Sequence, residues 1–375
     1  MFSKIPEPFP CLANLPPLEG FEAILNAANF WSVKCSCTTD NGENTQNIFG
    51  RSHIRILETD LSHASMTELA LVTSNPQIAP LIQGLLIHRG EDASLGEGFK
   101  WPRDELGQLI APAVFIGQLV AIVSALPNCS SFAVSRAPNP VFTAVNKNFP
   151  TPSEAVTILN AVISIAGVQV GRYGTDFRLY GHSPSMKGNP VDQVSFDPIH
   201  LRDPGFRSAM EGIEVLTLKF PAGSADTVSF ASSLMGSAPS LQELTIDFDE
   251  GKGAGTLMTQ LVSTGPRFQL QSLTLRNGTL SGRDLWTFLE FNCATMRILH
   301  LEQIRLEENG SWLPIMGLLR EGLPNLREAA LIDLMSGPDA IDTWSLEFAE
   351  FPKGCHPDGP QHRRFVWDRK EEVAY

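Results

Sequence analysis

The chain has 375 residues, of which 43% are hydrophobic, so it can bury a large core and is not disordered throughout. Its formal net charge is -13, and so acidic a surface argues against nucleic acid and anionic membranes as main partners. The six cysteines are too sparse for a disulfide framework, and prolines stand where a signal peptide needs an apolar helix. We therefore expect a cytoplasmic or nuclear protein.

Residues 1–50 differ from the rest of the chain. They are rich in Pro and Asn and carry no repeat, so we expect an irregular N-terminal segment there. Periodic structure begins near Ile54 with a predicted strand, and a predicted helix follows over 65–73. We expect a repeat array over 51–336 and a C-terminal cap or tail over 337–375, whose aromatic and charged residues suit a cover for the last repeat.

Seven short segments share one spacing, with an apolar residue at positions x, x+3 and x+5. The last five begin 28, 29, 26 and 30 residues apart, a period that suits one strand and one helix, as in leucine-rich repeats. Such a unit buries its apolar face only by stacking on its neighbours. The predicted fold is α/β: a leucine-rich-repeat-like solenoid with a curved parallel sheet and outer helices. The segments are Ile82/Leu85/Ile87, Cys129/Phe132/Val134, Ile213/Leu216/Leu218, Leu241/Leu244/Ile246, Leu270/Leu273/Leu275, Met296/Leu299/Leu301 and Leu326/Ala329/Leu331.

The stretch Leu106–Leu126 carries no charge over 21 residues, which is long enough to cross a bilayer. It contains Pro112 and two glutamines, has no basic flank, and ends in LPNC, much as a later helix ends in LPNL. We predict a buried helix of the array here and no membrane partner, with a membrane span as the alternative.

Gly/Pro-rich stretches over 136–152 and 171–207 are poorly periodic, and we expect loops inserted between repeats, with Ile165/Val168/Val170 as a weaker strand between them. The second loop holds His182, Asp192, Asp197, His200 and Asp203, so a hydrolase or metal site there is an alternative function. No cysteine or histidine cluster has zinc spacing, so we expect no metal and no cofactor.

Side chains at x+2, x+4 and x+6 alternate with the buried ones, and we expect them on the concave side of the sheet. At x+6, Lys219, Asp247, Arg276 and Glu302 alternate in sign. Two interpretations stay open: a self-neutralising charge row beside a threonine ladder, each exposed pair contributing about 0–1 kcal/mol, or a surface that binds a protein. The candidate binding residues are Thr217, Lys219, Glu243, Thr245, Asp247, Thr274, Arg276, His300 and Glu302.

Two stretches carry a resemblance to a known family. Phe49–His88 is similar to the segment that follows the F-box in fungal F-box proteins with degenerate leucine-rich-repeat-like arrays, and Met296–Leu334 resembles their repeats. Only Leu15-Pro16 and 21–29 match an F-box, which is therefore degenerate or missing.

The resemblance implies a non-enzymatic interaction scaffold, either the substrate receptor of a cullin-type ubiquitin ligase or a relic of one. An adaptor would then bind through residues 1–50. The alternative among binding proteins is a free-standing repeat protein without a link to a ligase.

Overall fold

The computed structural model describes residues 56–88, 94–105, 107–135, 148–176, 203–220, 225–248, 253–307 and 310–336, with the backbone of 343–349 and 366–370. The chain divides into two units, Met1–His53 and Ile54–Tyr375, and every described residue belongs to the second. The expected irregular segment over 1–50, with its adaptor contact, lies outside the described residues.

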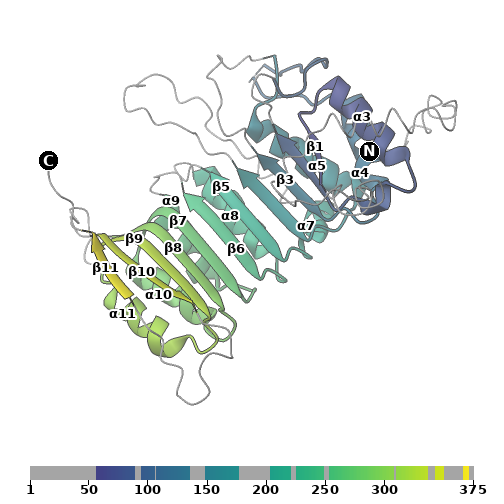
Figure 1. Cartoon of the computed structure of the whole chain (residues 1–375). Coiled ribbons are helices and arrows are strands. Elements are labelled where there is room, and N and C mark those ends of the chain that lie inside the picture. The colour runs from purple at the N-terminus through teal and green to yellow at the C-terminus, as the bar shows by residue number, and fades with distance from the viewer. Residues whose placement is uncertain are drawn as a thin grey trace. The chain divides into compact units, whose positions relative to one another are not determined.

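The second unit is built on one open sheet whose strands lie side by side in chain order (Figure 1). Strands β1 to β9 are parallel, and each pairs with the next. Strands β10 (Thr343–Ala349) and β11 (Val366–Lys370) continue the sheet beyond β9 in antiparallel pairing. The parallel strands are β1 (Ile56–Thr59), β2 (Gly84–His88), β3 (Ser131–Ser135), β4 (Arg172–Asp176), β5 (Val215–Phe220), β6 (Glu243–Phe248), β7 (Ser272–Leu280), β8 (Ile298–Leu306) and β9 (Glu328–Ser336).

The helices lie on one side of the sheet, where α3, α4, α5 and α7 pack in sequence, as do α8, α9, α10 and α11 (Figure 1). They begin at polar caps where the sequence offers them: Ser281 accepts a hydrogen bond from the Asp284 amide at the start of α10. The helical segments are α3 (His63–Ser74), η2 (Ala79–Leu81), α4 (Ala113–Ser124), α5 (Pro152–Ala166), α7 (Pro204–Met210), α8 (Ala225–Gly236), α9 (Gly253–Thr264), α10 (Gly282–Phe291), α11 (Leu313–Gly317) and the π-helical turn η3 (Leu318–Gly322).

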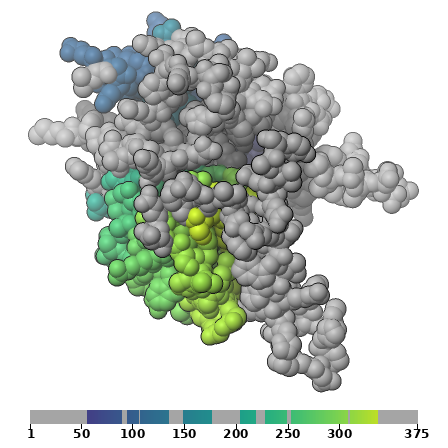
Figure 2. Space-filling model, turned by 90° about the vertical axis from the view of Figure 1, so that its left-hand side faces the viewer, coloured from purple at the N-terminus to yellow at the C-terminus, as the bar shows by residue number. Residues whose placement is uncertain are grey.

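The apolar spacing found in the sequence sets the register of the sheet. The x+3 residues of neighbouring strands are direct partners, as in the run Leu216, Leu244, Leu273 and Leu299. All the residues at x, x+3 and x+5 in the seven predicted segments are buried. Successive strand–helix units therefore share one continuous core, and the space-filling view shows the later units as adjoining bands in chain order (Figure 2). The predicted α/β class with a parallel sheet is confirmed.

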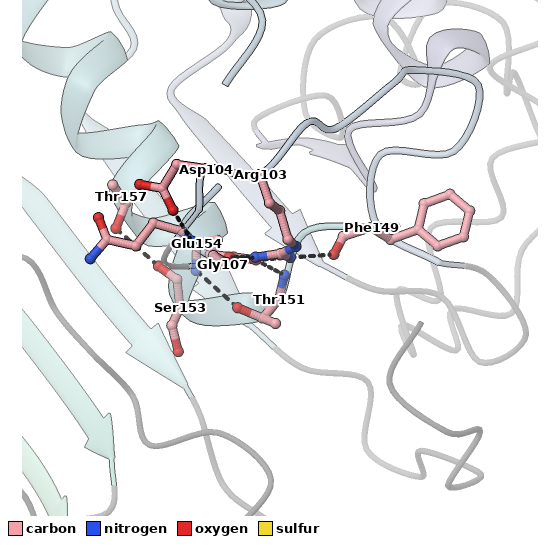
Figure 3. Close-up of polar contacts among 9 residues, drawn as sticks. Arg103, Asp104, Gly107, Phe149, Thr151, Ser153, Glu154 and Thr157 are labelled. Atoms are coloured by element: carbon pink, nitrogen blue, oxygen red, sulfur yellow. Dashed lines mark hydrogen bonds and ion pairs between the residues drawn. The ribbon is translucent and has the colours of Figure 1, made fainter. Parts of the chain in front are cut away.

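A clamp around Arg103 ties the segment before α4 to the start of α5 (Figure 3). Its guanidinium contacts both carboxylate oxygens of Glu154, with Nη1–Oε1 at 2.5 Å and Nη2–Oε2 at 3.0 Å, and also donates to the carbonyls of Gly107 and Phe149. The same Glu154 closes a capping box with Thr151. The hydrogen bond to Glu154 raises the pKa of Arg103. The clamp thus ties the connection between β2 and α4 to the start of α5.

The uncharged stretch 106–126 is a helix only in its second part. Helix α4 begins at Ala113, directly after Pro112, because proline restricts the preceding residue and itself suits a helix start. Phe115, Leu119, Ile122 and Val123 are buried, whereas Val114 and Ile110 are exposed. Within the described residues, no helix is both long enough and apolar enough to cross a membrane.

The predicted strand at Ile165/Val168/Val170 is wrong, as is the start of the inserted loop at 171. Ile165 belongs to the last turn of α5, and strand β4 runs over Arg172–Asp176. Its true repeat is Val170, Tyr173 and Thr175, all buried, with Thr175 standing where the other strands carry an apolar residue. Because Thr175 is polar, this segment did not match the apolar spacing of the other strands. Residues 177–202 lie outside the described part.

Candidate binding face

We call the face of the sheet that carries the x+2, x+4 and x+6 side chains the front face. The buried x+3 and x+5 side chains point to the opposite face, toward the helix layer, since side chains alternate along a strand. The predicted rows are formed by direct Cα partners: Lys219, Asp247, Arg276 and Glu302 in one, and Thr217, Thr245, Thr274 and His300 in the other. Glu243 lies on the same face, between Val215 and Ser272.

Asp247 is too deeply buried to contact a partner directly. Only 2% of its surface is exposed, and its Oδ1 accepts a hydrogen bond from Asn277 Nδ2 at 2.7 Å. Thr274 is also buried, at 9% exposure. The expectation that both side chains reach a partner is therefore corrected: Asp247 orders the neighbouring strand, and Thr274 lies beneath its neighbours. Among the predicted residues with described side chains, the others keep partial or full exposure.

The charges on the front face are largely paired between neighbouring strands. Arg276 Nε lies 2.8 Å from Glu302 Oε2, as the alternating row predicts. His300 Nε2 lies 2.8 Å from Glu328 on β9, a partner the sequence did not suggest. His88 and Glu58 form a similar pair between β2 and β1 at 3.1 Å. The side chain of Lys219 is outside the described part. Exposed pairs of this kind contribute about 0–1 kcal/mol each, so they add little to the stability of the fold.

A second feature of this face, which the apolar spacing does not indicate, is a row of left-handed residues at x+7. Asn277, Gln303 and Asp333 have φ of 57°, 54° and 52° and occupy equivalent places in β7, β8 and β9. Each puts two successive side chains on the front face and lets the strand continue, so that Gly278, Ile304 and Leu334 again point to the core. Non-glycine residues rarely adopt this conformation, and no glycine in the sequence marks these three positions.

This row separates two groups of strands. Strands β7 to β9 have nine residues each, whereas β5 and β6 have six. In β6 the x+7 residue is Phe248, which is fully buried. A Cβ at Gly278 would lie 2.9 Å from the Phe248 ring and 3.1 Å from Ala254, so glycine is required there for the close approach. The front face is therefore longest along β7, β8 and β9.

The alternative hydrolase or metal site is represented by one described residue. Asp203 caps α7, accepting hydrogen bonds from the Gly205 amide and from the Ser164 hydroxyl. His182, Asp192, Asp197 and His200 lie outside the described residues. Across the described ranges, no group of three or more His, Cys, Asp or Glu side chains is placed to hold a metal.

The buried ionisable groups of the core are held neutral. Burial raises the pKa of the Cys129 thiol to about 12, and burial also raises the pKa of Tyr173, whose hydroxyl donates to Asn160 at 2.7 Å. A thiol with so high a pKa is a poor nucleophile. These two groups stabilise the core and supply no reactive centre.

No protein-family model matches the sequence, and no curated protein is significantly similar to it.

Proposed function

We propose that this protein is a non-enzymatic interaction scaffold, built as a leucine-rich-repeat-like solenoid, that binds a protein partner on the front face of β5 to β9. One observation carries the proposal: polar side chains from five successive strands lie in register on the front face, opposite the face that packs against the core. Repeat arrays commonly bind through such extended surfaces.

The centre of this face favours a protein over a small ligand. Thr217 and Thr245 are half-buried and uncharged, and Glu243 projects beside them as an exposed carboxylate. The centre of the face thus combines weakly polar threonine side chains with the exposed carboxylate of Glu243. A broad surface of this kind gains affinity by covering many residues of a partner at once.

The test uses charge reversal on the two sides of the molecule. Glu243→Lys alters the exposed margin of the front face, and Glu290→Lys makes the same change on α10, in the helix layer. Partners captured by tagged protein from cells and identified by mass spectrometry should be lost with Glu243→Lys and retained with Glu290→Lys. Equal retention by both variants contradicts binding on the front face.

Within this proposal, the family resemblance supports a role as substrate receptor of a cullin-type ubiquitin ligase, or as a relic of one. The adaptor would then bind the apolar residues of the N-terminal segment, Leu15, Leu18, Phe21, Ile24, Leu25, Phe30 and Trp31. We expect weak adaptor binding or none, and any binding should disappear when residues 1–50 are deleted. Binding that survives the deletion contradicts the assignment of the contact, and absence from both proteins favours a free-standing scaffold.

A further inference from the structure

An open groove lies beyond the C-terminal ends of β7 and β8, away from the front face. It has a volume of about 460 Å³ and runs between the start of α10 and the loop that leads to α11. Its lining residues are Ser281, Gly282, Arg283, Trp286, Glu307, Gly310, Ser311 and Pro314.

Two glycines leave the floor of the groove without side chains. A Cβ at Gly310 would lie 2.6 Å from the Leu306 side chain and 2.9 Å from the Glu307 carbonyl, so only glycine fits in this tight loop. Gly282 faces it, with its Cβ position 3.8 Å from the Gly310 Cα. Backbone from two connections thus forms the floor, and side chains rise only at the walls.

The walls carry Arg283 and the apolar residues Trp286 and Pro314, and Leu313 precedes Pro314 in the chain. Arg283 is exposed and has no ion-pair partner within the described chain, unlike Arg276 or Arg103. The indole of Trp286 is half-buried against the core, and Leu313 beside Pro314 is 80% exposed, the highest value among the described large apolar residues. An unpaired guanidinium next to exposed apolar surface is the arrangement that protein interfaces favour.

The one acidic lining residue has a structural use. Glu307 Oε1 lies 3.0 Å from the position of a Cβ on Gly255, so the missing side chain of Gly255 leaves room for this carboxylate at the first turns of α9. Negative charge is favourable near a helix N-terminus. The charge of Arg283 therefore remains available to a ligand.

We infer that this groove binds a short segment of a protein partner in which a carboxylate side chain stands next to a large apolar side chain. The carboxylate pairs with Arg283, a geometry that guanidinium groups form readily with two oxygens, and the apolar side chain covers Trp286 and Leu313. The groove is separate from the front face, so this binding does not depend on the function proposed above.

The probe is a displayed library of random dodecapeptides, selected on the full chain and measured afterwards as labelled peptides by fluorescence anisotropy. Selected peptides should carry Asp or Glu beside Leu, Ile, Phe or Trp. Arg283→Gln should weaken their binding at least tenfold, and Leu313→Ser should weaken it several-fold. Arg267→Gln is the matched control, because Arg267 is also exposed and has no ion pair with a described residue, but lies outside the groove. It should leave the affinity unchanged.

Two further measurements test whether the peptides bind the front face instead and whether a second copy of the chain fills the groove. Thr245→Arg blocks the front face and should leave peptide binding intact; loss of binding would place the peptides there and overturn the inference. Sedimentation of the full chain should show no dimer that Leu313→Ser dissociates, since such a dimer would mean that a second copy fills the groove. Selection of peptides without acidic residues, or equal affinity for Arg283→Gln and the unmodified protein, also overturns it.

Discussion

Replacement of Thr175 by valine should stabilise the protein. The side chain is 1% exposed, lies at an x+5 position between Val134 and Leu218 on the neighbouring strands, and its Oγ1 has no hydrogen-bond partner among the described residues. A buried hydroxyl without a partner costs about 1–3 kcal/mol. Valine has nearly the same shape, so it fills the same space without that cost. We therefore expect Thr175→Val to raise the free energy of unfolding by about 1–2 kcal/mol.

Urea denaturation followed by tryptophan fluorescence measures this change, which should appear as a higher midpoint at an unchanged slope. Thr217→Val is the control, since Thr217 lies on the next strand but faces the front, half-buried, and should change stability by less than about 0.5 kcal/mol. Thr175→Ser tests the packing: it keeps the hydroxyl, loses a methyl group, and should destabilise by about 1 kcal/mol. If Thr175→Val lowers the free energy of unfolding, the hydroxyl is bonded and the argument fails.

Four further outcomes follow from the geometry of the described residues. Gln303→Gly should be neutral or stabilising by up to about 1 kcal/mol, because glycine accepts the left-handed φ, whereas Gln303→Val should destabilise; a loss with glycine in urea denaturation would contradict strain at this position. Arg103→Ala should cost about 1.5–3 kcal/mol, because its hydrogen bonds to the Glu154 carboxylate are charge-assisted; proteolysis should then cut near 103–112 sooner than in the unmodified protein. Asp247→Lys should cost more than about 3 kcal/mol, since it buries a cation beside Arg276, and an unchanged thermal midpoint would refute this burial. Cys129 should resist alkylation at pH 8 until denaturant is added. Because burial raises its folded pKa above the unfolded value, its contribution to stability is complete below about pH 9 and is lost as the pH rises toward 12. Cys129→Val should abolish this part of the dependence of the free energy of unfolding on pH.

The apolar spacing of the sequence determined the register of the sheet. A slip of one residue would move every x+3 and x+5 side chain from the core to the other face, so the pattern permits a single alignment. For the same reason the spacing alone was enough to predict Lys219, Asp247, Arg276 and Glu302 as neighbours in one row.

Tertiary packing decided what no local pattern could express. Strand β4 was missed because Thr175 stands at a core position where the other strands carry an apolar residue. The pairing of β4 with β3 and β5 shows its place in the sheet. The left-handed residues Asn277, Gln303 and Asp333 look ordinary in sequence, and only the pairing of β7, β8 and β9 places them at equivalent positions. The burial of Asp247 depends on its contact with Asn277 of the next strand, and the groove lined by Arg283 depends on where the connections after β7 and β8 meet, so neither can be inferred from a local pattern.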